Sequence, residues 1–187
     1  MAPQILKESV KLTKIRKTSA TTPSIVTLDL YWTTDTDVDL GVLLELRDGP
    51  RRKYVIQALD REFGSLTSAP YISLSGDDRH GGHEQIQLDL AHMDNVVRAM
   101  AFAYIYQGGN WRTVGDARVE VHHPTLGDFV IPLDKSRAHS CALVDFQSDG
   151  NGGLVMTRLA EFFRGYQADI DRHYGWPNIN WQAGSKD

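Results

Sequence analysis

The chain has a single cysteine, Cys141, and no long apolar run. One cysteine cannot form a disulfide within the chain, so we expect a reducing compartment. The longest apolar stretch, residues 96–106, is broken by Arg98 and is shorter than the ~20 residues that a membrane-spanning helix needs. The segment Met1–Gln4 has neither the charged nor the apolar part of a signal peptide. These absences predict a cytoplasmic protein that does not itself span a membrane.

The sequence also lacks the common catalytic motifs. It has no Gly-x-Ser-x-Gly elbow, no Gly-x-x-x-x-Gly-Lys phosphate loop and no His-Glu-x-x-His helix. A net charge of −4 argues against a nucleic-acid binder that depends on phosphate contacts. The one basic stretch, Lys11–Lys17, has no interleaved aromatic residues and is interpreted as a solvated strand end. We therefore expect neither catalysis nor a nucleic-acid partner.

What dominates the sequence is an alternation of apolar and polar residues, which is typical of half-buried strands. Such runs occupy residues 26–32, 86–90, 117–121 and 129–133. Two more continuously apolar runs, 41–46 and 99–106, are typical of central strands that are buried on both faces. Glycine-rich and proline-containing turns separate the runs, and the turn at residues 149–153 is interpreted as part of a hairpin.

These patterns predict an all-β, mainly antiparallel fold, a two-sheet β-sandwich with one or two short helices. The best helix candidate is Tyr166–Tyr174, with a short turn near Asp94. At 187 residues and 41% hydrophobic content, the chain suffices for one domain with a sizeable core. We expect a single domain over residues 1–187, with the aromatic segment 176–181 packed on its body and a frayed tail from about residue 184.

An acidic run, Asp35-Thr36-Asp37-Val38-Asp39, carries aspartates at alternate positions. In an extended segment they fall on one face, because strand side chains alternate between faces. Their charges repel one another unless a cation lies among them, and a hard cation with oxygen ligands fits this need. The run does not match the EF-hand pattern, because Leu40 and Leu46 stand where that loop has glycine and glutamate. A metal site and a solvated acidic loop both remain open for this run alone.

The acidic run is one of several separated motifs that occur in a definite order. They are Trp32, Asp37–Gly41, Leu44–Gly49, Phe63–Ser65, Pro70–Ile72, Gly76–Arg79, Ala101–Gly108, Asn110–Trp111 and Asp171–Trp176. From about residue 10 onward, this order resembles the tellurite-resistance TerD family, in particular its TerA-like branch. The resemblance implies a calcium-binding β-sandwich of the bacterial stress response, which acts through binding and assembly and not through turnover.

The resemblance also implies which residues would hold calcium. They are Asp37 and Asp39 on the acidic strand, Asp77 and Asp78 on a glycine-aspartate loop, and Glu84 at the end of that loop. The chain departs from the family at two points: Gly41 stands where many members have a third aspartate, and the loop before Glu84 is shortened. Fewer anionic ligands predict only moderate affinity for calcium.

The partners implied by the resemblance are other TerD-family proteins and a membrane-associated resistance complex. Two alternatives stay open. A metal-free scaffold would assemble with other TerD-like proteins through exposed strand edges, whereas an undetected hydrolase would use Asp37 and Asp77 as acid and base. The adjacent His122 and His123 would point to opposite faces of a strand and could not easily share an ion, so we interpret them as surface histidines.

Overall fold

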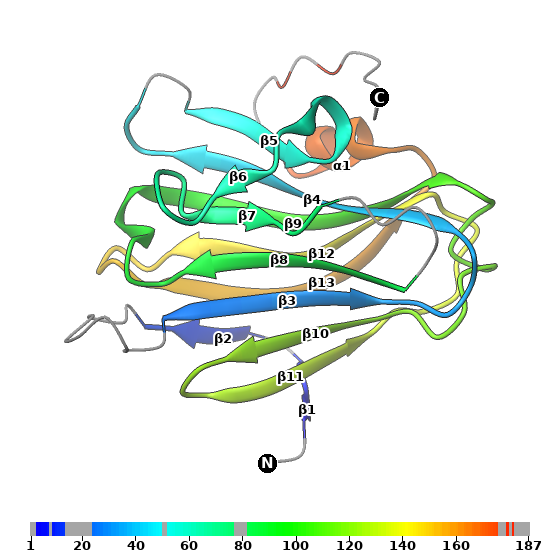
Figure 1. Cartoon of the computed structure of the whole chain (residues 1–187), viewed down its shortest axis with the longest axis horizontal. Coiled ribbons are helices and arrows are strands. Elements are labelled where there is room, and N and C mark those ends of the chain that lie inside the picture. The colour runs from blue at the N-terminus through cyan, green and yellow to red at the C-terminus, as the bar shows by residue number, and fades with distance from the viewer. Residues whose placement is uncertain are drawn as a thin grey trace.

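A computed structural model of the chain describes residues 3–7, 9–13, 24–49, 52–76, 82–175, 179 and 181. Strands make up most of this part and form two sheets that pack face to face, with one short helix against the outside of the rear sheet (Figure 1). The predicted all-β sandwich is therefore confirmed.

The front sheet in Figure 1, here called sheet A, has the strand order β1-β11-β10-β3-β8-β7-β6. Its strands are β1 (Gln4–Ile5), β3 (Ile25–Tyr31), β6 (Gly64–Ser65), β7 (Ile72–Leu74), β8 (His83–Asp89), β10 (Arg118–His123) and β11 (Gly127–Pro132). Neighbouring strands run antiparallel except for β1, which lies parallel to β11. The first strand of the chain therefore closes one edge of the sheet.

The rear sheet, here called sheet B, has the order β2-β13-β12-β9-β4-β5 and is antiparallel throughout. Its strands are β2 (Ser9–Leu12), β4 (Asp37–Leu46), β5 (Lys53–Gln57), β9 (Val96–Gln107), β12 (Ser140–Ser148) and β13 (Leu154–Phe163). The predicted hairpin joins β12 to β13, and the Asp149 carboxylate accepts the N–H groups of Asn151 and Gly153 within its turn.

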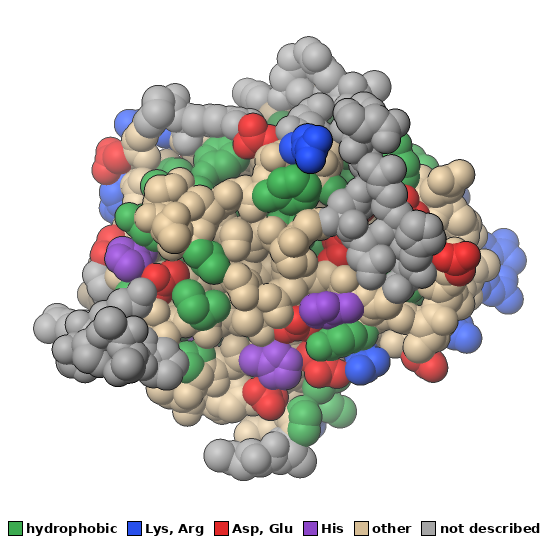
Figure 2. Space-filling model, in the orientation of Figure 1, with side chains coloured by type: hydrophobic (Ala, Val, Ile, Leu, Met, Phe, Trp, Pro, Cys, Tyr) green, Lys and Arg blue, Asp and Glu red, His purple; other side chains and the backbone are tan. Residues whose placement is uncertain are grey.

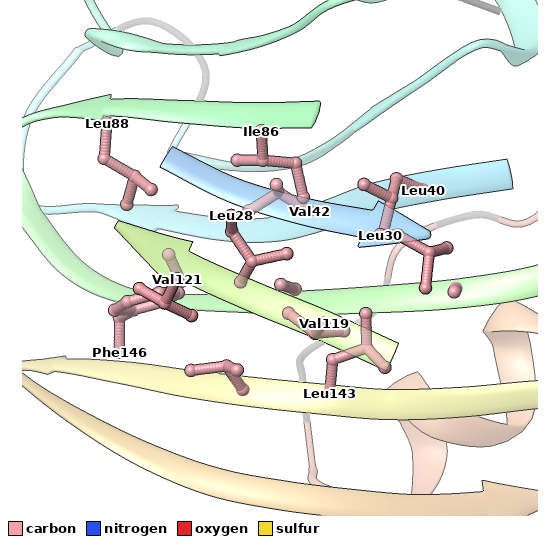
Figure 3. Packing of buried hydrophobic residues seen from close by; sticks show 14 of the residues in the cluster. Leu28, Leu30, Leu40, Val42, Ile86, Leu88, Val119, Val121, Leu143 and Phe146 are labelled. Carbon is pink, nitrogen blue, oxygen red and sulfur yellow. The ribbon is translucent and has the colours of Figure 1, made fainter. Parts of the chain in front are cut away.

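The main core lies between the two sheets and is formed by the apolar positions of the alternating runs. Figure 3 shows Leu28 of β3 and Val121 of β10 directed toward the strands of sheet B, from which Val42 and Phe146 point back. Leu28 and Val121 are also directly paired across β3 and β10, and both are fully buried. The apolar residues of the alternating runs thus form the buried face of sheet A.

A second, smaller apolar cluster covers the outer face of sheet B. It contains Leu43, Val55, Met100, Phe102, Tyr104 and Ala142 from the strands and Ile170 from the helix α1 (Gln167–His173). This cluster explains why the runs at 41–46 and 99–106 are apolar without interruption, since β4 and β9 are buried on both faces as predicted. Ile179 and Trp181 pack against the same cluster, and the Trp181 indole N–H donates to the Asp171 carboxylate at 2.7 Å.

Two short 3-10 turns complete the described structure, η1 (Leu59–Arg61) and η2 (Met93–Asn95), the second at the position predicted for a short turn. None of the helices within the described ranges is both long and apolar enough to cross a bilayer. Cys141 is fully buried in the main core on β12, and burial raises the pKa of its thiol. It behaves as the small core residue that a lone cysteine among apolar neighbours indicates.

Candidate functional site

The last three residues of the acidic run, Asp37–Asp39, begin strand β4. Successive side chains of this strand point to opposite faces of sheet B. Val38 and Leu40 point into the main core. Asp37 and Asp39 therefore face the opposite side of sheet B, the side on which α1 lies. Asp39 is fully buried and is paired with Tyr104 of β9, while Asp37 is half-buried at the end of the strand.

Glu84 reaches the same place from the other sheet. It lies near the start of β8, is 1% exposed, and its Oε2 accepts the backbone N–H of Leu40 at 2.5 Å. The pairing of β5 with β4 ends at Gly41, so the Glu84 carboxylate binds the β4 backbone immediately beyond the end of that ladder. A carboxylate of sheet A thereby links the two sheets beside the acidic run.

Tyr104 of β9, the cross-strand partner of Asp39, has a buried hydroxyl that is affected by the charges of these carboxylates. Burial raises the pKa of its hydroxyl well above the usual value, and the charge of Asp39 adds to the shift. The charges of Glu84 and Asp37 raise the pKa of Tyr104 further, in that order. The charges of three of the five sequence-predicted residues therefore act on one buried hydroxyl.

The other two predicted residues, Asp77 and Asp78, lie outside the described residues. In the part of the chain that the structure describes, no three His, Cys, Asp or Glu side chains are spaced to hold a metal ion. The carboxylate oxygens of Asp37, Asp39 and Glu84 are of the type that calcium takes, but they do not form a complete shell by themselves. The acid–base pair of the hydrolase alternative, Asp37 with Asp77, likewise includes a residue outside the described part.

Gly41 has a structural reason to differ from the aspartate that the family resemblance implies. A Cβ atom at this position would lie 2.4 Å from Cζ of Phe102, far inside contact distance. The Phe102 ring is fully buried and lies across the β4 backbone where a side chain of residue 41 would otherwise stand. An aromatic ring thus takes the space of a third carboxylate on this strand.

The paired histidines of β10 do point to opposite faces, but one of them is not on the surface. His122 is half-buried on the outer face of sheet A, where its Nδ1 lies 3.0 Å from Oδ1 of Asp128. His123 is only 5% exposed, and its Nδ1 accepts the backbone N–H groups of Thr125 and Leu126 at 3.1 and 3.0 Å. The prediction of a surface histidine is therefore wrong for His123, because its ring fixes the turn between β10 and β11.

This arrangement makes the turn sensitive to pH. Burial lowers the pKa of His123 from the usual 6.5, so the unfolded chain takes up a proton before the folded one does. Stability from this residue is complete above pH 6.5 and is lost as the pH falls toward its folded pKa. We expect His123→Asn, whose amide oxygen can accept the same N–H groups, to reduce the acid-induced loss by up to about 1 kcal/mol.

Urea unfolding of both proteins at about pH 8 and about pH 5 measures the difference, since the other titrating groups are common to both. A histidine titration by NMR gives the pKa of His123 directly. An ordinary pKa for this ring would contradict the expectation.

A second polar cluster, which sequence reasoning missed, lies on the outer face of sheet A. Figure 2 shows histidines and acidic side chains gathered over β3 and β10. At its centre the Asp29 carboxylate, 4% exposed, lies 2.6 Å from Nε2 of His83 and accepts hydrogen bonds from Thr27 and Gln85. The His83 ring stacks on Tyr31 with ring centres 4.7 Å apart. His83 and Gln85 come from β8 and Asp29 from β3, so the pairing of these two strands brings them together.

Comparisons with known proteins connect this structure to the sequence motifs. The scan against family models gives no match. The chain is 33% identical over 156 residues to the tellurium resistance protein TerA of Alcaligenes sp., which covers 80% of this chain and 44% of that protein. The chain thus spans less than half the length of this relative.

The fold also matches a solved structure, the protein SAV2460 of unknown function. The TM-score is 0.59 at 18% identity, over 83% of this chain and 98% of that one, so this likeness concerns the fold alone. The motif order, the sandwich and the identity to TerA agree. Over the region compared, the chain is similar to TerA, a member of the group that its motifs resemble.

Proposed function

We propose that this chain is a tellurite-resistance protein of TerD type that binds calcium and acts in the stress response without catalysing a reaction. The observation that carries the proposal is the burial of two carboxylates beside the start of β4, where Glu84 accepts the N–H of Leu40, the residue next to Asp39. Asp39 and Glu84 are both shielded from solvent. Carboxylates withdrawn from water in this way are normally paired or bound to a cation.

Calcium would be held by these three carboxylates together with Asp77 and Asp78, which precede β8 in the chain. It would neutralise the acidic residues and tie β4 of one sheet to the beginning of β8 in the other. Residue 41 can add no ligand while Phe102 lies against it, so we expect moderate affinity. Because Asp39 and Glu84 are closed off from solvent, direct action on a substrate is disfavoured.

Thermal unfolding in chelator, calcium and magnesium tests the proposal. A cation that binds only the folded state raises stability by about 2.7 kcal/mol at a hundredfold excess over Kd. We expect calcium to raise the Tm and magnesium to do so poorly, since magnesium demands near-octahedral geometry and gives up water reluctantly. The response to calcium should disappear in Asp39→Asn and in Glu84→Gln.

The Glu84→Gln variant separates metal binding from folding. Its amide oxygen can still accept the Leu40 N–H, so the variant should keep most of its stability in chelator while losing the response to calcium. Asp134→Asn, an exposed change between β11 and β12, is the matched control and should respond as the wild type does. A wild-type Tm that millimolar calcium leaves unchanged would exclude the metal and favour the scaffold alternative.

The partners and the location are part of the same proposal. We propose that the protein is cytoplasmic and assembles with other TerD-family proteins and a membrane-associated resistance complex. Sheet B ends at β2 on one side and at β5 on the other. Edge strands present backbone N–H and C=O groups that another chain can pair with, and this supports assembly whether or not calcium is bound.

A further inference from the structure

A cavity of about 660 Å³ lies at the end of β4 away from the acidic residues. Asp37 starts this ten-residue strand and Leu46, at its other end, lines the cavity. At about 3.3 Å per residue, the two features are roughly 30 Å apart along the strand. In Figure 1 the β4–β5 hairpin end and the β6–β7 connection lie together at this end of the molecule. The cavity is therefore separate from the proposed calcium site.

One wall of the cavity is the segment from η1 to β6, which is held by backbone hydrogen bonds. The N–H of Arg61 donates to the carbonyl of Ala58, and the N–H of Gln57 donates to the carbonyl of Glu62, both at 3.0 Å. Arg61 and Gly64 have positive φ angles of 57° and 71°, so the chain curls tightly here. These contacts fix the direction in which the wall presents its side chains.

The opposite wall, the turn after β4, is fastened to η2 by one side chain. The Asn95 amide accepts the N–H of Asp48 at 2.9 Å and donates to the carbonyl of Asp48 at 3.0 Å. The N–H of Arg47 donates to the backbone carbonyl of Asn95 at 2.8 Å. Both walls are thus held by their own hydrogen bonds, and the volume lies within the ~300–1,000 Å³ typical of small-molecule sites.

The side chains that line the cavity combine an apolar surface with two opposite charges. Leu46, Tyr54, Phe63 and Pro70 supply the apolar surface. Asp48 and Arg61 supply a carboxylate and a guanidinium, and among the described residues neither group forms an ion pair. Glu62, the other charged side chain of the lining, is engaged in a contact of its own.

We propose that this cavity binds a small zwitterion with an apolar body, that is, a free hydrophobic amino acid or a dipeptide. The ligand's carboxylate would pair with Arg61 and its ammonium group with Asp48, while its apolar side chain would lie against Tyr54 and Phe63. Guanidinium–carboxylate contacts are among the stronger and more directional hydrogen bonds in proteins. A simple anion would face the Asp48 carboxylate and a simple cation the Arg61 guanidinium, so a ligand that carries both charges is the complementary one.

Titration calorimetry of the full chain in chelator tests this proposal independently of calcium. The probes are L-phenylalanine, the dipeptide leucyl-phenylalanine, and N-acetyl-phenylalanine amide, which keeps the apolar body but has neither charge. We expect at least one zwitterion to bind and the amide to bind at least about tenfold more weakly, because each charge-assisted contact is worth roughly a factor of ten. The tighter zwitterion identifies the ligand as an amino acid or a peptide.

Single variants assign the two charges. Arg61→Gln and Asp48→Asn should each raise Kd roughly tenfold. Arg112→Gln, an exposed arginine in the loop after β9, should leave Kd unchanged. The proposal is overturned if neither zwitterion binds, if the amide binds as tightly as the zwitterions, or if the two cavity variants bind as the wild type does. The amide comparison uses the wild-type protein and so does not depend on how the variants fold.

Discussion

Replacing Gly41 with aspartate should lower the free energy of unfolding by about 3 kcal/mol or more, although it would introduce the carboxylate that the family resemblance implies. The new Cβ would lie 2.4 Å from Cζ of Phe102 and 2.9 Å from both of its Cε atoms. Overpacking of a core costs about 1–3 kcal/mol, and a further carboxylate beside the buried Asp39 adds the cost of desolvating a like charge. Urea unfolding in chelator measures the loss.

Two further variants separate these contributions. Gly41→Ala adds the clash without the charge, so it should account for part of the loss. In a Phe102→Ala background the space is open, and Gly41→Asp should then cost less than it does in the wild type. Equal costs in the two backgrounds would show that Phe102 does not occupy the position of the missing side chain. If the double variant also binds calcium more tightly than Phe102→Ala alone, the ring is what limits the ligand set.

The sequence predicted the strands well because their signal is local. Alternation in a run such as 26–32 needs only the chain itself, and burial on both faces explains the continuous run at 99–106. The order of strands in each sheet was not predictable in this way. The parallel pairing of β1 with β11 joins residues more than a hundred positions apart, and the two-residue strand β1 is too short to leave a periodic signal.

In the candidate site too, contacts between residues far apart in the sequence could not be predicted. Asp37, Asp39 and Glu84 were found through the motif resemblance, but the role of Tyr104 was not, because it depends on the register between β4 and β9. That register contains an irregularity between Asp37 and Val38, which a sequence pattern does not reveal. His123 was misjudged for a related reason, since its ring accepts hydrogen bonds from a turn that follows it in the chain.

Leu28→Ala should cause a loss of comparable or greater size, about 3–5 kcal/mol, because it removes side-chain atoms from the centre of the main core. Leu28 is fully buried on β3 and is paired with Val121 on one side and with Ile86 on the other. In Figure 3 these side chains share the space between the sheets with Val42 of β4. Rigid strands on both sides limit how far the surroundings can close around the cavity, so the cost should lie toward the upper end of the usual range.

Leu126→Ala is the matched control, because it deletes the same atoms from a side chain that is 41% exposed in the turn between β10 and β11. We expect it to change stability by less than about 0.5 kcal/mol, and the difference between the two variants then isolates the effect of burial. For a chain of this length, the loss at Leu28 corresponds to a fall in Tm of roughly 10 °C. Equal effects of the two substitutions would contradict the placement of Leu28 at the centre of the sandwich.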